Sequence, residues 1–82
     1  MAFDILNKMK WTGNLGKCDI IILHRGAPKD RKLIKGSLVT GLDRHYFYYS
    51  ENGRETTIPL HRVLEIWSEG KIIWKRKPEK KN

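Results

Sequence analysis

The longest apolar run of the chain lies in the stretch Asp19-Ile20-Ile21-Ile22-Leu23-His24. Its central residues are β-branched or apolar at both odd and even positions, so a strand here would be apolar on both faces. Gly26-Ala27-Pro28 follows and ends the pattern, because glycine and proline interrupt regular structure. The stretch therefore predicts a central strand at 19–24 that is covered on both faces.

A helix that could cover one face of this strand is predicted just before it. Three apolar residues recur there at helical spacing, namely Ile5, Leu6 and Met9. Asp4 would lie in the first turn, where an acidic side chain suits the helix dipole. These features predict a short helix over residues 2–10, with Trp11 anchoring its end.

The second half of the chain is typical of strands joined by tight turns. Residues 45–50 would send Phe47 and Tyr49 to one face of a strand. Asn52-Gly53 is a strong hairpin signal and predicts a return strand at 55–58. Other predicted elements are an extended piece at 32–35, a turn or brief helix at 36–39, and a last hairpin of strands 63–67 and 71–75. Together they predict an α+β fold with a short N-terminal helix packed on a small, mainly antiparallel β-sheet.

Size and composition limit the classes of protein that fit. The chain has 82 residues, 39% of them hydrophobic, which suffices for one small core but not for two. No apolar run approaches the roughly 18 residues of a membrane span, and the start lacks the pattern of a signal peptide. A single cysteine, Cys18, excludes an internal disulfide and a cysteine zinc site. We expect one cytoplasmic domain over 1–76 without membrane partner, metal or cofactor.

The charge of the chain favours polyanionic partners. Seventeen Lys and Arg against nine Asp and Glu give a net charge of +8, which suits nucleic acid or an anionic membrane. Six of the positive side chains fall in residues 71–82, and a second focus lies at 25–35. We expect 77–82 to be a basic, disordered tail that either aids solubility or docks on RNA.

Two His-Arg pairs are the strongest candidates for a binding site. His24-Arg25 is followed by Gly26, and His61-Arg62 is preceded by Pro59, so each pair lies where a strand meets a chain breaker. The arginine fork matches phosphate oxygens, and histidine donates to anions or exchanges a proton near neutral pH. Backbone N–H groups of Gly26 and Ala27 would add donors. Brought together, the pairs would form a compact anion pocket.

Structural roles for the same residues stay open at this point. His24 shares a strand face with Ile20 and Ile22, so it could be a boundary histidine of the core. Asp30 could form an Asx turn or pair with Arg25. Arg62 could pack its aliphatic stem among apolar neighbours.

Aromatic side chains suggest a second way of binding nucleic acid. Exposed aromatics on a sheet near basic residues can stack on the bases of single-stranded RNA. We expect Phe47, Trp67 and Trp74 in a two-sided core, whereas Tyr46 and Tyr48 could be exposed. His45, at the start of the predicted strand, is expected to be structural.

Taken together, these motifs resemble the RNA cyclic-group end recognition domain, a family of small archaeal proteins. Its first signature is matched by His24-Arg25-Gly26-Ala27-Pro28-x-Asp30, with Ile34-x-Gly36 beyond. Its second signature is matched by Ile58-Pro59-Leu60-His61-Arg62-Val63-Leu64-x-Ile66. The opening residues 4–11 and the closing Gly70 and Trp74 match as well, so the resemblance covers about residues 2–76.

The resemblance implies an RNA-binding module that recognises RNA ends with a cyclic or terminal phosphate. It assigns this role to His24, Arg25, His61 and Arg62, with Asp30 orienting them, and it implies RNA-processing or RNA-repair enzymes as partners.

Two alternatives remain. The first is a metal-free phosphoesterase whose histidines act as general base and acid while arginine stabilises the charge that develops on phosphorus. The second is a basic subunit that docks on a ribonucleoprotein through residues 71–82. We favour binding over catalysis, because the chain is small and members of the family occur fused to separate catalytic modules.

Overall fold

The computed structural model describes residues 1–77, and the tail predicted at 77–82 lies, apart from Lys77, outside the described residues. Helix α1 (Ala2–Trp11) comes first, which confirms the predicted N-terminal helix. The strands are β1 (Cys18–Leu23), β2 (Arg31–Lys35), β3 (Val39–Leu42), β4 (Tyr46–Glu51), β5 (Arg54–Pro59), β6 (Val63–Ser68) and β7 (Lys71–Lys75). Short 3-10 helices are η1 (Leu15–Lys17), η2 (Pro28–Asp30), η3 (Gly36–Leu38) and η4 (Leu60–Arg62).

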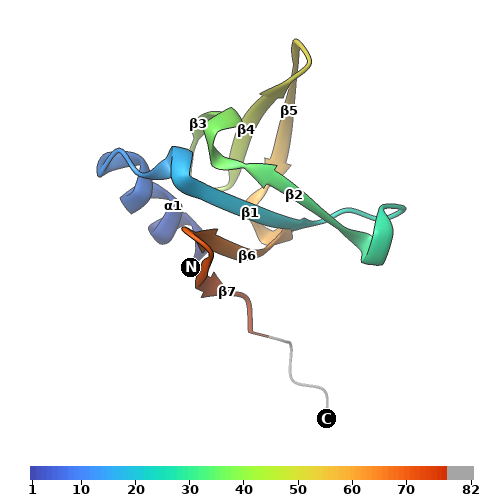
Figure 1. Cartoon of the computed structure of the whole chain (residues 1–82). Coiled ribbons are helices and arrows are strands. Elements are labelled where there is room, and N and C mark those ends of the chain that lie inside the picture. Colours follow the sequence, from blue (N-terminus) through green and yellow to red (C-terminus); the bar gives the residue numbers. More distant parts are fainter. Residues whose placement is uncertain (78–82) are drawn as a thin grey trace.

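The strands form two antiparallel sheets, so the α+β class is confirmed, although the single sheet of the prediction is divided. One sheet has the order β2-β1-β6-β7 and the other the order β3-β4-β5. Figure 1 shows the β4–β5 hairpin projecting away from the four-stranded sheet. The division occurs at η3, which was predicted as a turn or brief helix, because the unpredicted strand β3 starts a new sheet there.

Strand β1 is central, as predicted, with β2 and β6 as its neighbours. Ile20 and Ile22, on its inner face, are at most 1% exposed. The prediction that both faces are covered is wrong, since Ile21 and Leu23 on the outer face are only half-buried. Within residues 1–77 no helix covers this outer face, and Leu33, the β2 partner of Ile21, is 51% exposed.

The core lies where α1, β1 and the three-stranded sheet meet. Leu6 of α1, Ile20 of β1 and Phe47 of β4 line one small internal gap and are each at most 1% exposed. Trp11 does not anchor the helix end, because it is 79% exposed. It follows Leu6 by five residues, which places it about 140° around a helix of 3.6 residues per turn, on the solvent side.

Two further observations bear on function. No helix in the described part of the chain is both long and apolar enough to cross a bilayer. Within residues 1–77, no group of three His, Cys, Asp or Glu side chains is placed to hold a metal ion.

Candidate functional site

The two His-Arg pairs lie at the same end of the four-stranded sheet. His24-Arg25 directly follows β1, and His61-Arg62 directly precedes β6. Strands β1 and β6 are antiparallel neighbours, and Ile22 of β1 pairs with Val63 of β6. The end of β1 and the start of β6 are therefore adjacent, and the segments that carry the two pairs leave the sheet side by side.

All four side chains of these pairs are exposed. Within residues 1–77 none of them makes a hydrogen bond or an ion pair. The role of His24 as a core histidine is excluded, because β1 ends at Leu23 and His24 lies beyond the last paired residue. The side chains thus remain accessible to a ligand.

Asp30 fastens the loop that carries the first pair. Its Oδ1 accepts a hydrogen bond from the backbone N–H of Gly26 at 3.2 Å, and its carbonyl accepts one from the N–H of His24 at 2.8 Å. The N–H of Ala27 donates to the carbonyl of His24 at 3.2 Å. The two backbone donors expected to serve an anion are therefore engaged within the loop, and Asp30 orders that loop without pairing with Arg25.

Arg76 holds the turn that carries the second pair. Its Nε donates to the carbonyl of Val63 at 2.8 Å and its Nη2 to the carbonyl of Leu60 at 3.1 Å. These two carbonyls flank His61-Arg62, so one guanidinium fixes both ends of η4. Sequence reasoning counted Arg76 only as charge, because contacts between arginine and backbone carbonyls leave no pattern in a sequence.

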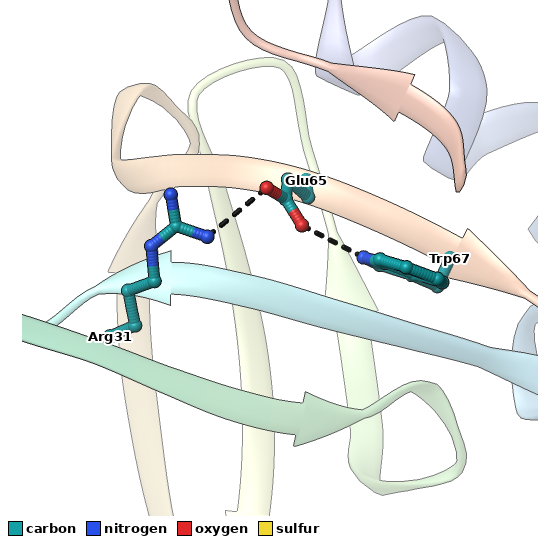
Figure 2. Close-up of polar contacts among 3 residues, drawn as sticks. All are labelled: Arg31, Glu65 and Trp67. Atoms are coloured by element: carbon teal, nitrogen blue, oxygen red, sulfur yellow. Dashed lines mark hydrogen bonds and ion pairs between the residues drawn. The ribbon is translucent and has the colours of Figure 1, made fainter. Parts of the chain in front are cut away.

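A polar network lies beside the first pair on the outer face of the sheet. Arg31, the β2 partner of Leu23, donates from Nη1 to Glu65 Oε2 at 3.1 Å, and Trp67 Nε1 donates to Glu65 Oε1 at 2.9 Å (Figure 2). The Trp67 hydrogen bond, followed by the contact with Arg31, holds the pKa of Glu65 below its usual range. Trp67 therefore lies half-buried on the outer face and not in the predicted core, and the charge of Arg31 is neutralised locally.

Glu65→Gln is expected to flatten the acid side of the stability profile. Because folding lowers the pKa of Glu65 from its ordinary value of 4.5, its ionised form stabilises the fold above that pH. This contribution is lost as the pH falls through the lower folded-state pKa, and glutamine cannot titrate. Urea unfolding from pH 7 to pH 3 measures the difference, with Glu69→Gln in the exposed β6–β7 turn as control. A Glu65→Gln curve parallel to the wild type below pH 4.5 would contradict the role of Glu65.

A cleft of about 670 Å³ is lined in part by Leu60 and His61 of η4. It is bounded by the start of α1, the turn before β4, η4, and the end of β7 with the residues after it. Of the four residues in the His-Arg pairs, only His61 lines it. His45, expected to be structural, also lines the cleft and is exposed. His61 thus faces a space that Arg62 and the first pair do not line.

Comparison with known proteins points to one family. Residues 1–76 match the family model described as the MJ1316 RNA cyclic group end recognition domain. The UPF0248 protein MJ1316 of Methanocaldococcus jannaschii is 37% identical over 81 residues, which cover 94% of this chain and 95% of that protein. A UPF0248 protein of Metallosphaera sedula is 34% identical over 74 residues, covering 89% of this chain and 88% of that one. No solved structure is significantly similar to this chain.

Proposed function

The chain belongs to the family of the MJ1316 RNA cyclic group end recognition domain, and from this we propose that it is an RNA-binding module for RNA ends with a cyclic or terminal phosphate. Its binding site comprises the two His-Arg pairs at the shared end of β1 and β6. RNA is the polyanion that suits both the family and the net charge of +8.

One observation carries the proposal, namely the division of the two signatures into a buried half and an exposed half. Five apolar signature residues are at most 7% exposed, namely Ile34, Ile58, Leu60, Val63 and Ile66, and Leu64 is half-buried. The core therefore accounts for them. His24-Arg25 and His61-Arg62 are exposed and lack protein partners within residues 1–77, so packing gives them no role. Ligand binding supplies one.

The chemistry of these side chains suits a terminal phosphate. Arg25 and Arg62 would each bind non-bridging oxygens through two parallel N–H groups. His24 and His61 would donate to the ring or ester oxygens. Asp30 and Arg76 act as positioning residues, because they order the two turns that present these side chains.

The test is a titration of three short RNAs that differ only in a 2′,3′-cyclic phosphate, an open phosphate or a hydroxyl at the end. Wild-type protein should prefer the phosphate ends. Arg62→Ala should weaken their binding by about 10- to 100-fold, since a charged hydrogen bond contributes about 1.5–3 kcal/mol. Arg62→Lys should recover only part, because a point charge does not replace a fork. Arg54→Ala, at the start of β5, is the matched control and should bind normally.

Three outcomes would contradict the proposal, and each would favour a different function. Equal affinity for all three ends, unchanged in Arg25→Ala and Arg62→Ala, would leave a general basic RNA binder. Conversion of the cyclic end to an open phosphate, abolished by His24→Ala or His61→Ala, would establish a phosphoesterase. Loss of all RNA binding on removal of residues 77–82 would instead favour docking through the tail.

A further inference from the structure

We propose that the cleft beside η4 binds the last nucleosides of a single-stranded RNA, base against aromatic ring, and leads the RNA end to His61. The inference rests on the proposed function and adds to it the form of RNA that is recognised. The cleft volume of about 670 Å³ lies within the range of about 300–1,000 Å³ that is typical of small-ligand sites. A nucleotide-sized group therefore fits.

Three aromatic side chains line the cleft from three different elements: Phe3 of α1, Tyr46 of β4 and Trp74 of β7. Tyr46 is 43% exposed, whereas its neighbour in β4, Phe47, is fully buried in the core. The guanidinium of Arg76 lies 5.4 Å from the ring centroid of Trp74, and the same group is fixed on the carbonyls of η4. This guanidinium lies over one face of Trp74, so the exposed ring of Tyr46 is the main stacking surface, and such a surface accepts any base.

The charge around the cleft suits a nucleic-acid backbone. Its lining, within residues 1–77, includes Arg44, Lys75, Arg76 and Lys77 and no acidic side chain. Arg76 is engaged with η4, whereas the other three make no hydrogen bond or ion pair in the described part of the chain. Three cations thus remain for phosphates, while a protein partner would need acidic groups to match them.

Two acids lie next to cleft-lining residues: Asp4 pairs with the amino group of Met1 at 3.4 Å, and Asp43 is used to build the turn that presents Arg44, His45 and Tyr46. Its Oδ1 accepts from the N–H groups of His45 and Tyr46, each at 2.9 Å, and its Oδ2 accepts from the Tyr48 hydroxyl at 2.7 Å. The Tyr48 hydrogen bond, followed by the two backbone contacts, holds the pKa of Asp43 below its usual range. The carboxylate therefore stays ionised and orders this turn.

The cleft is joined to the end-binding site through η4. The N–H of Leu60 donates to the carbonyl of His45 at 2.8 Å, so the turn before β4 and the turn that carries His61-Arg62 are tied together. A strand with a base on Tyr46 would have its terminus near His61, which lines the same cleft. An exposed aromatic ring, free cations and a residue shared with the proposed phosphate site, His61, together favour single-stranded RNA over an acidic peptide.

The experiment compares RNAs of one, two, three and five nucleotides that carry the same 2′,3′-cyclic phosphate. Wild-type affinity should rise over the first two or three nucleotides. Tyr46→Ala should weaken binding of the five-nucleotide RNA by about 5- to 150-fold, the range measured for loss of one stacked base. Its effect on the cyclic nucleoside monophosphate should be smaller than its effect on the five-nucleotide RNA, and a preference for cyclic over hydroxyl ends should persist, because the two His-Arg pairs are intact. Arg44→Ala should also weaken binding of the five-nucleotide RNA.

Matched controls exclude general effects of surface charge or aromatic area. Trp11→Ala removes a more exposed aromatic from the far end of α1, and Arg54→Ala removes the same charge as Arg44→Ala from the start of β5. Both should bind all RNAs normally. Tyr46→Phe, which keeps the ring, should also bind normally, and circular dichroism checks that each variant is folded.

The outcomes separate this inference from the proposed function. If length and Tyr46→Ala have no effect while cyclic ends are still preferred, the cleft assignment is overturned and end recognition stands. If length and Tyr46 matter but all ends bind equally, the cleft assignment stands and end recognition fails. Competition by a polyglutamate peptide as effective as RNA would overturn the assignment to RNA.

Discussion

Phe47→Ala is expected to lower the free energy of unfolding by about 3–5 kcal/mol, the usual cost of removing a buried phenyl ring. Phe47 is 0% exposed and pairs with Leu42 of β3 and Ile58 of β5. It also lines the gap shared with Leu6 of α1 and Ile20 of β1, so its ring joins the helix and both sheets. Small domains are stable by about 5–15 kcal/mol, so the variant would lie near its unfolding limit.

Urea unfolding followed by tryptophan fluorescence measures this loss. Phe47→Leu should cost less than Phe47→Ala, because most of the buried volume is kept. Tyr46→Ala, one residue away on the opposite face of β4, is the matched control and should change stability by no more than about 1 kcal/mol. A loss below about 1 kcal/mol for Phe47→Ala would show that the two sheets do not share a core.

The parts of the fold that could be predicted are those that local patterns determine. The apolar run at 19–24 predicted the central strand, and the helical spacing of Ile5, Leu6 and Met9 predicted α1. Asn52-Gly53 gave the β4–β5 hairpin, because both residues adopt positive φ, at 54° and 75°, as a two-residue turn of this kind requires. Each signal lies within a few consecutive residues.

The features that were missed depend on contacts between distant residues. Strand β3 has only four residues and contains Gly41, so its two β-branched residues, Val39 and Thr40, are too short a run to mark it as a strand. The outer face of β1 carries two large apolar residues, Ile21 and Leu23, as the inner face does with Ile20 and Ile22. Only the arrangement of α1 and the second sheet decides which of these pairs is buried. Trp67 was wrongly assigned to the core because its aromatic side chain does not show which face of the sheet the rest of the protein covers.

The candidate site shows the same limit. The His-Arg pairs could be named from the sequence, but their placement at one end of the sheet depends on the register between Ile22 and Val63. That register joins residues 41 positions apart and leaves no local signal. The cleft combines the start of α1, the turn at 43–46 and the end of β7, and its most exposed aromatic, Tyr46, was only one of two open candidates.

Gly36→Ala is expected to be about as damaging as Phe47→Ala, although it adds only a methyl group. A Cβ at this buried position would overlap the carbonyl oxygen of Leu15 and lie 2.9 Å from that of Cys18. Both atoms belong to the backbone, so no side-chain rotation can relieve the overlap, and η1 and η3 must move apart. Overpacking costs about 1–3 kcal/mol where side chains can adjust, and we expect at least the upper end of that range here.

Thermal and urea unfolding test this expectation, with Gly16→Ala in η1 as the matched control. A Cβ at Gly16 meets nothing within 4 Å, so that variant should stay within about 0.5 kcal/mol of the wild type. Wild-type stability of Gly36→Ala would contradict the close approach of η1 and η3. Gly36 and Ile34 both belong to the first signature. Gly36 is required because there is no room for a side chain, and Ile34 packs in the core. The exposed His24-Arg25 pair is then a part of that signature without a packing role, as the proposed RNA-binding site requires.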